Sequence, residues 1–361
     1  MVRIAIIGCG IVGASIAFEL SRFPGLKVTV FDKQPPAQAS TGASLGVLMG
    51  VISHKTKGRN WQLRETSLQR YETLIPELAA MTGRKIPFNK QGILMLCSEG
   101  EDLSKWEKLV ATRQSQGWEL EIWDVDLVRD RNPHLALNPN IIAAIYSPQD
   151  RQVDPTVLTL ALVDAAKING VNFEFGVEVA GLAELHSQVC QIQTTLGNLE
   201  FDRLIIAAGL GSSALTASLN QLVDIRPVLG QALHLRSPNP LGNPDFAPVI
   251  TCDDVHIVPL GNQEYWVGAT VEFPVNGGEI QANAEMLEQV MARAIVLCPA
   301  LAAATIIRKW SGLRPRPEGR PAPIIDRLSG NSNILIASGH YRNGVLLAPA
   351  TARTIREMIV Q

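Results

Sequence analysis

An apolar run, a glycine turn and a second apolar run follow one another in RIAIIGCGIVGASIAFEL, residues 3–20. Residues 3–7 read as a strand that is buried on both faces. Gly8, Gly10 and Gly13 then form the spacing G-x-G-x-x-G at the start of an expected helix. Each glycine has a steric reason: a tight turn, close approach of the backbone to a pyrophosphate, and close packing of helix on strand. The stretch therefore predicts the first unit of a Rossmann-like, dinucleotide-binding α/β fold.

A second expected strand, KVTVFDK (27–33), carries Asp32 at its carboxyl end. A carboxylate at this place can accept hydrogen bonds from both hydroxyls of an adenosine ribose. The glycine turn and Asp32 together predict a bound dinucleotide, and a glycine turn without a ligand is the alternative. NAD and FAD share this turn, so the motif does not separate them.

Composition excludes several other classes of protein. The chain has 361 residues, of which 46% are hydrophobic and 18% charged, so it can bury a large core and divide into two domains. A net charge of −2 and the lack of a dense Lys/Arg block argue against nucleic acid or an anionic membrane as partner. The glycines in residues 3–20 argue against a membrane span. Five dispersed cysteines and isolated histidines predict a cytoplasmic protein without disulfides or a metal site.

The middle of the chain favours FAD over NAD. VDPTVLTLALVDAAKING (153–170) predicts a helix with Asp154 as N-cap and Gly170 after its end. QVCQIQTTLGNLEFDRLIIAAGLGSSAL (188–215) predicts a hairpin, then a strand that runs into a glycine turn and a helix. These parts resemble those that complete the FAD domain of large two-part flavoproteins. The alternative is that IIAAG is only the end of a buried strand.

The remaining segments predict an inserted layer of mixed α and β structure. Residues 86–100 read as a hairpin, and 101–117 as an amphipathic helix with Leu103, Trp106 and Val110 on one face. Strands are expected within 226–273, and a helix that Asn283 caps ends before Pro299. The fold class expected is α/β, with an antiparallel sheet over the flavin. The expected division is an FAD-binding domain of residues 1–85, 152–225 and 308–361, and a substrate domain of 86–151 and 226–307.

Two segments near the C-terminus point to a family: WSGLRPRPEGRPAPIID (310–326) and NILIASGHYRNGVLLAPATA (333–352). They resemble the D-amino-acid oxidase superfamily of FAD-dependent oxidoreductases, and most closely its glycine oxidase branch from the thiamine pathway. The family pattern is Trp-x-Gly-Leu-Arg-Pro, then Gly-His-aromatic-Arg-Asn-Gly and a Leu-Ala-Pro-Ala-Thr helix. The resemblance spans the chain, because the glycine turns and both segments occur in the family's order.

The resemblance implies three residues at the substrate. Arg314 matches the arginine that holds the substrate carboxylate, a task that suits a planar guanidinium. Arg342 matches a second arginine near substrate and flavin, with a solvated surface charge or an ion-pair partner as the alternative. His256 stands where the family has an aromatic residue above the substrate, so substrate preference is expected to differ from the family's norm.

The resemblance also implies the residues that line FAD. They surround the phosphate turn, the adenosine, the middle of the flavin and the C-terminal glycine segment. His340 has a second interpretation, as a buried histidine that shapes its turn by a hydrogen bond. The implied cofactor-binding residues are Gly8, Gly10, Ile11, Val12, Gly13, Asp32, Lys33, Thr41, Gly42, Gly46, Val47, Leu48, Val179, Ala208, Gly209, Gly339, His340, Tyr341, Arg342, Asn343, Gly344, Val345 and Leu346.

The implied reaction is oxidation of a small amine acid: glycine, sarcosine or a small D-amino acid. The α-hydrogen passes as hydride to flavin N5, and water hydrolyses the imine to a 2-oxo acid and ammonia, with no general base required. Dioxygen, which yields hydrogen peroxide, or a quinone then takes the electrons. The segment after Arg314 lacks the cysteine with which sarcosine-oxidase relatives attach their flavin, so non-covalent FAD is expected.

Three alternatives stay open: a D-amino-acid or secondary-amine dehydrogenase of the same superfamily, an NAD-linked dehydrogenase, and a catalytically silent flavin-binding module. The sequence leaves a homo-oligomer open. The loop at residues 40–61 is longer and more basic than is usual in the family, which again predicts a shifted substrate preference.

Overall fold

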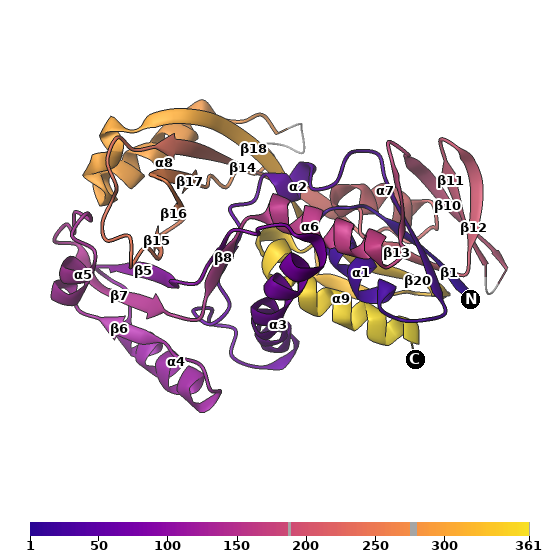
Figure 1. Cartoon of the computed structure of the whole chain (residues 1–361), viewed down its shortest axis with the longest axis horizontal. Coiled ribbons are helices and arrows are strands. Elements are labelled where there is room, and N and C mark those ends of the chain that lie inside the picture. Colours follow the sequence, from indigo (N-terminus) through magenta and orange to yellow (C-terminus); the bar gives the residue numbers. More distant parts are fainter. Residues whose placement is uncertain (187–188, 275–279, 361) are drawn as a thin grey trace.

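The computed structural model describes residues 1–186, 189–274 and 280–360. It has two parts, which lie next to each other in Figure 1. One surrounds a mainly parallel six-stranded sheet and contains both termini, and the other surrounds an eight-stranded, mainly antiparallel sheet. The predicted α/β fold class, with a Rossmann-like part, is confirmed.

The six-stranded sheet has the order β19-β20-β13-β1-β2-β9, in which only the pairing of β19 with β20 is antiparallel. Its central strands β1, β13 and β20 are mostly buried between layers and mainly apolar, as expected for residues 3–7, although Arg3 is exposed; the edge strands β9 and β19 carry exposed polar residues. The strands are β1 (Val2–Ile7), β2 (Leu26–Asp32), β9 (Asn172–Phe175), β13 (Arg203–Ile206), β19 (Ile324–Leu328) and β20 (Asn331–Ser338).

Helices cover one face of this sheet, and a small sheet covers the other. α1 packs between α6 and α9, and α3 packs against both of these helices. The helices are α1 (Ile11–Ser21), α3 (Gly58–Thr82), α6 (Pro155–Ile168) and α9 (Gly344–Val360). The elements near the opposite face are β10 (Val179–His186), β11 (Val189–Thr194), β12 (Gly197–Phe201), η1 (Gly209–Gly211) and α7 (Ser212–Ala217).

Several local predictions in this part are confirmed. The Asp154 carboxylate caps α6 by accepting hydrogen bonds from the amides of Thr156 and Val157, both at 2.9 Å. The predicted hairpin is β11 and β12, followed by β13, the glycine turn and α7. Residues 187–188, at the start of that prediction, lie outside the described residues.

The eight-stranded sheet has the order β18-β14-β17-β16-β15-β5-β7-β6. Asn283 caps α8 as predicted, because its side chain accepts from the Glu285 amide at 2.9 Å. The strands are β5 (Ile93–Ser98), β6 (Glu121–Trp123), β7 (Ile141–Ser147), β14 (Ile225–Arg236), β15 (Val249–Cys252), β16 (Val255–Gly261), β17 (Glu264–Gly268) and β18 (Thr305–Pro317). The helices of this part are α4 (Leu103–Ser115), α5 (Val125–Arg131), α8 (Ala284–Leu297) and η2 (Pro299–Ala303).

The prediction that residues 86–100 form a hairpin is wrong. β4 (Phe88–Asn89) pairs with β8 (Arg151–Val153), whereas β5 pairs with β7 and β15. β8 also pairs with β3 (Val47–Leu48), so β4 belongs to a separate three-stranded sheet. β4 and β5 pair with strands that are distant in the sequence. The burial of apolar side chains in the folded core selects these partners, and closeness in the sequence does not.

The division into domains stays a proposal. Strand β18 crosses the expected boundary at residue 308 and pairs with β14 from Thr305 to Pro317. We therefore propose that the substrate domain continues to residue 317. Within the described ranges, no helix has both the length and the apolar character needed to cross a bilayer.

Candidate active site

The glycine turn is packed so tightly that side chains would not fit. Gly8 has φ +102°, and a Cβ there would lie 2.5 Å from the Ala207 carbonyl oxygen. A Cβ at Gly13 would lie 1.9 Å from the Gly8 carbonyl oxygen. The helix α1 therefore approaches the turn as closely as the glycine spacing predicts.

Asp32 lies against this turn. Its carboxylate accepts hydrogen bonds from the Cys9 amide at 2.6 Å and from the Gln34 amide at 2.9 Å. Two accepted bonds leave further lone pairs for a ribose hydroxyl. Lys33 is mostly exposed, and its ammonium lies 3.6 Å from the Glu178 carboxylate.

Several of the expected cofactor residues meet at one edge of the parallel sheet. The turn at Gly8 follows β1, Asp32 ends β2, Ala208 follows β13, and Gly339 follows β20. Because these strands are parallel, their carboxyl ends share an edge, where doubly wound sheets bind dinucleotides. Val179 opens β10, in the neighbouring small sheet.

A short helix links the glycine turn to the large sheet. In α2 (Ala39–Gly42), Thr41 is buried and its hydroxyl accepts from the Ile11 amide at 3.0 Å. The neighbouring Ser40 hydroxyl donates to the Leu313 carbonyl of β18 at 2.6 Å. One turn of helix thus connects the expected phosphate-binding residues to the strand that carries Arg314.

The end of α2 and the loop after it are also closely packed. A Cβ at Gly42 would lie 2.4 Å from the Ala37 carbonyl oxygen. Gly46 has φ +69°, and a Cβ there would lie 1.8 Å from the Val153 carbonyl oxygen. Val47 and Leu48 form β3, so the loop expected along the flavin is held against β8.

The C-terminal glycine segment turns sharply and then enters the buried helix α9. Gly339 and Tyr341 have positive φ values of 65° and 53°, and η3 (Tyr341–Asn343) leads into Gly344. Val345 and Leu346 are buried. His340 is also buried, and its Nε2 lies 3.0 Å from the Thr351 hydroxyl, as the second interpretation of this histidine predicts. Burial lowers the pKa of His340 to about 4, so its ring is neutral at pH 7.

Arg314 and His256 share one face of the eight-stranded sheet. Arg314 and Trp310 are four residues apart on β18, so their side chains point to the same side. Trp310 pairs with Ala232 of β14. Ala232 pairs in turn with Gly268 of β17, which pairs with His256 of β16. Directly opposed residues share a face, so pairing places the two expected substrate residues on the same surface.

That face is directed toward the nucleotide-binding part. A Cβ at Gly268 would lie 3.2 Å from Leu45 Cδ1, and one at Gly312 would lie 2.2 Å from Ala43 Cβ. The opposite face packs against α8 through Leu233 and other apolar residues. The expected substrate residues and the expected flavin-binding loop therefore lie on facing surfaces.

The Arg314 guanidinium is held in place by backbone carbonyls. Nη1 donates to the Leu229 carbonyl and Nη2 to the Thr270 carbonyl, each at 3.0 Å. Burial, and after it the charge of Arg342, lower the pKa of Arg314 from its ordinary value. A guanidinium has five N–H donors, so these bonds leave donors for a carboxylate.

Arg342 lies close enough to Arg314 and His256 for its charge to act on both, and the three residues are called the cluster below. Arg342 already forms an ion pair. Its Nη2 donates to Asp254 Oδ1 at 2.6 Å, and the two side chains are 40% and 59% exposed. Burial raises the pKa of Asp254, but the hydrogen bond and charge of Arg342 outweigh burial and lower it overall. The alternative of an ion-paired arginine therefore holds for Arg342 in this structure.

His256 is neutral and has an unused nitrogen. Burial, followed by the charges of Arg342 and Arg314, lowers its pKa to about 4. Its Nδ1 atom is buried and has no hydrogen-bond partner among the residues described. Trp266, on the same face, has a buried Nε1 that also has no hydrogen-bond partner among the residues described. Buried polar atoms without partners are rare in native proteins, so this surface suits a polar ligand.

Sequence reasoning missed four residues around this cluster. Asp254 follows Asp253 in a turn, and its nearness to His256 in TCDDVHIV was the available signal. Gly230, over which Arg314 lies, carried no local signal. Thr270 and the buried Glu272 are hydrogen-bonded to each other. They follow a stretch with a strong strand pattern, and no motif marked them as site residues.

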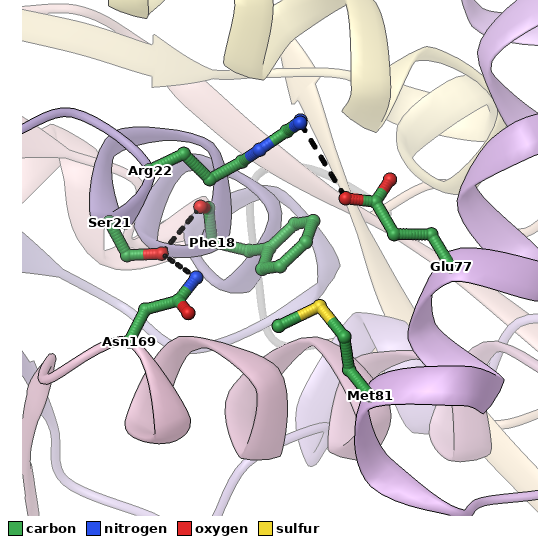
Figure 2. A pocket seen from close by; sticks show the side chains of 6 residues that line it. All are labelled: Phe18, Ser21, Arg22, Glu77, Met81 and Asn169. Atoms are coloured by element: carbon green, nitrogen blue, oxygen red, sulfur yellow. Dashed lines mark hydrogen bonds and ion pairs between the residues drawn. The ribbon is translucent and has the colours of Figure 1, made fainter.

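A surface pocket of about 380 Å³ lies apart from this cluster, at the end of α1 away from the glycine turn (Figure 2). Its polar groups pair with one another: Asn169 donates to the Ser21 hydroxyl at 3.0 Å, and Arg22 lies 3.6 Å from Glu77. None of the expected site residues lines it. The residues that line it are Phe18, Ser21, Arg22, Glu77, Met81 and Asn169.

Residues 3–358 match the family model described as FAD dependent oxidoreductase, DAO. The chain belongs to this family. The resemblance in the C-terminal segments is thus confirmed, and the chain is an oxidoreductase with FAD as its cofactor.

Similar proteins include two kinds of relative. Bifunctional protein ThiO/ThiG of Synechocystis sp. is 31% identical over 364 residues, 99% of this chain and 51% of that protein. Glycine oxidase of Bacillus licheniformis is 28% identical, over 98% of this chain and 92% of that protein. The crystal structure of glycine oxidase from Geobacillus kaustophilus matches with a TM-score of 0.90 at 26% identity, over 100% of this chain and 95% of that one. The chain spans about half the length of the ThiO/ThiG relatives.

The residues present suit FAD. The amides in the first turn of α1 have no acceptor within the helix. The Ile11 amide donates to the Thr41 hydroxyl, and the other amides of this turn can bind a pyrophosphate. Asp32 would hold the ribose, and the loop through Gly46 and the segment from Gly339 would flank the rest of the cofactor.

Proposed function

We propose that this chain oxidises small amine acids, such as glycine, sarcosine or a small D-amino acid, with non-covalent FAD as cofactor. One observation carries the proposal. Arg314 lies fixed and partly buried on the face that is directed at the FAD-binding loop, and only backbone carbonyls share its donors among the described residues. A cation in this position suits the carboxylate of an amino acid.

Binding would begin at Arg314. Its guanidinium can form two parallel hydrogen bonds to a carboxylate, which fixes the orientation of the substrate as well as its position. The bonds to Leu229 and Thr270 favour one orientation of the guanidinium. Such positioning is the main catalytic contribution available when the protein supplies no acid or base.

His256 would complete the polar part of the site. Because its pKa is about 4, its ring is neutral at pH 7 and adds no charge beside Arg314. Its unpaired Nδ1 can form a hydrogen bond with the substrate, and a histidine here in place of an aromatic residue would shift specificity. Bound FAD would supply the acceptor for a hydride from the substrate's α-carbon. The imine that leaves the site is hydrolysed by water to a 2-oxo acid and an amine, which is ammonia for glycine or a D-amino acid and methylamine for sarcosine.

The match to glycine oxidase relatives supports glycine as substrate, and the match to ThiO/ThiG relatives supports a role in thiamine biosynthesis. The test is anaerobic mixing of the FAD-loaded protein with glycine, sarcosine, D-alanine and L-leucine while flavin absorbance is recorded. We expect bleaching with one or more of the three small amine acids. No bleaching with any of them, although dithionite reduces the flavin, would refute the proposal. Peroxide formation after air is admitted would identify an oxidase, and reoxidation only by a quinone would identify a dehydrogenase.

A further inference from the structure

The ion pair between Arg342 and Asp254 joins the two parts of the molecule beside the proposed substrate site. Arg342 belongs to η3, which follows β20 of the parallel sheet. Asp254 belongs to the turn between β15 and β16 of the large sheet. The two charged groups are 2.6 Å apart and both are partly exposed, so they lie at the solvent side of the cluster.

The two arginines of the cluster differ in whether a carboxylate pairs with them. Arg314 bonds only to backbone carbonyls in the described part of the chain, and His256 is neutral. Glu272 is buried and close enough for its charge to act on Arg314, and Gln231 and Thr270 donate to its carboxylate. Arg342, in contrast, is neutralised by Asp254. Among the described residues, the cluster therefore offers a substrate one guanidinium that no carboxylate pairs with directly, not two.

We propose that Asp254 determines substrate specificity: by occupying Arg342, it restricts the site to amine acids that carry a single carboxylate. This inference rests on the proposed function, because it takes Arg314 as the group that binds the first carboxylate. A second carboxylate, on the nitrogen substituent or on the side chain, would meet Arg342 only by displacing Asp254. The displaced carboxylate would remain nearby and repel it.

The physical basis is that Arg314 attracts the first carboxylate of a ligand, whereas Asp254 repels a second one. A like charge placed against a bound ligand suppresses the wrong partner more effectively than a weak fit does. The effect is partly screened here because both side chains are exposed. It should therefore weaken as ionic strength rises.

The variants for the test are Asp254→Asn and, as matched control, Asp253→Asn in the same turn. Asp253 has φ +51°, a conformation that asparagine tolerates, and its side chain is exposed. Replacement of the Asp254 side chain leaves its carbonyl free to accept from the Ala269 amide, as it does at 3.2 Å. Asp254→Ser is the second variant if Asp254→Asn fails to retain FAD, and Asp254→Glu, which keeps the charge, should keep the parent selectivity.

The measurement is equilibrium binding of acetate and malonate to the oxidised holoenzyme, followed by the change in flavin absorbance. These probes are a mono- and a dicarboxylate that need no turnover. We expect Asp254→Asn to improve malonate binding relative to acetate by about tenfold. Asp253→Asn should leave the ratio unchanged. The ratio of kcat/KM for iminodiacetate over glycine should shift in the same direction.

An unchanged malonate to acetate ratio in Asp254→Asn, with FAD fully bound, would overturn the inference. So would a parent enzyme that already prefers malonate. If the ratio shifts but no amine acid bleaches the flavin, the proposed function fails while the anion selectivity of Asp254 stands. The two failures are thus separate.

Discussion

The guanidinium of Arg314 lies directly over Gly230 of the neighbouring strand. A Cβ at Gly230 would lie 2.2 Å from Nη2 and 2.4 Å from Cζ of Arg314. Val228 is the residue paired with Arg314, so Gly230 is its diagonal neighbour on the same face. The missing side chain creates the space in which the proposed carboxylate clamp lies.

Gly230→Ala should therefore displace the clamp. A shift of about 1 Å in a positioning group can cost on the order of 100-fold in rate, so we expect kcat/KM to fall by about 10- to 100-fold with FAD still bound. Steady-state kinetics on the best amine acid test this. In an Arg314→Ala background the same change should cost little, since the group that it displaces is gone. Equal costs in both backgrounds would contradict the explanation.

Arg314→Ala should remove a desolvated charge pair with the substrate. The expected cost is about 2–5 kcal/mol of transition-state binding, which is roughly 30-fold to several thousand-fold in kcat/KM. FAD content should barely change. Arg314→Lys should restore only part of the activity, because an ammonium cannot form the paired bonds of a guanidinium. An amine without a carboxylate should be a poor substrate that the mutation penalises far less, and near-parental activity of Arg314→Ala would disprove the clamp.

The protein should purify yellow and release its flavin as FAD after acid or heat denaturation. The reason is the glycine turn with Asp32, together with the lack of an attachment cysteine after Arg314. Chromatography and absorbance of the supernatant and the precipitate test this. Flavin that stays with the precipitated polypeptide would show a covalent bond.

His340 should make stability depend on pH between about 6.5 and 4. Burial lowers its pKa to about 4 in the folded chain, whereas the unfolded chain takes up the proton near pH 6.5. The unfolded state therefore binds more protons in this window, and stability falls as pH is lowered through it. The full loss for this one group is on the order of 3 kcal/mol. His340→Gln should be less stable at pH 7, because its fit to Thr351 is lost, but should show a flatter decline in Tm with falling pH; an equally steep decline would refute this role.

Asp150 should hold residues 50–52, in the middle of the basic segment 40–61, whose last part begins α3. It is fully buried, and its carboxylate accepts from the amides of Gly50, Val51 and Ile52 at 2.7, 2.8 and 2.9 Å. The buried Arg113 donates to the Val51 carbonyl at 2.6 Å. Each buried hydrogen bond to a charged group contributes about 1.5–3 kcal/mol to the free energy of unfolding.

Asp150→Ala should therefore lower Tm markedly and open the loop to protease. Limited proteolysis with mass spectrometry would place the new cleavage within residues 50–57. Asp126→Asn is the control, since that side chain is 92% exposed. Cleavage at the parental rate in Asp150→Ala would show that the loop is held by other contacts.

Local chemistry made much of the fold predictable from sequence. The glycine spacing before α1, the N-caps Asp154 and Asn283, and the apolar strand runs act over a few residues, so each determines its own segment. The C-terminal segments likewise carried enough specific residues to identify the family. Arg113 shows the limit, because nothing in its local sequence indicates that its guanidinium is buried between Trp61 and the carbonyls of residues 51–55.

The sequence by itself determined the dinucleotide turn and the α/β class, because these depend on residue type and short spacing, and the arginines of the proposed site followed from the family resemblance of two short segments. Only the tertiary structure decided which strands β4 and β5 would pair with, that Gly230 would lie under Arg314, and that Asp254 would neutralise Arg342. Gly230 and Arg314 are 84 positions apart, and Asp254 and Arg342 are 88 apart. Contacts at such separations are set by strand order and register, which the burial of the whole core selects and no local pattern encodes.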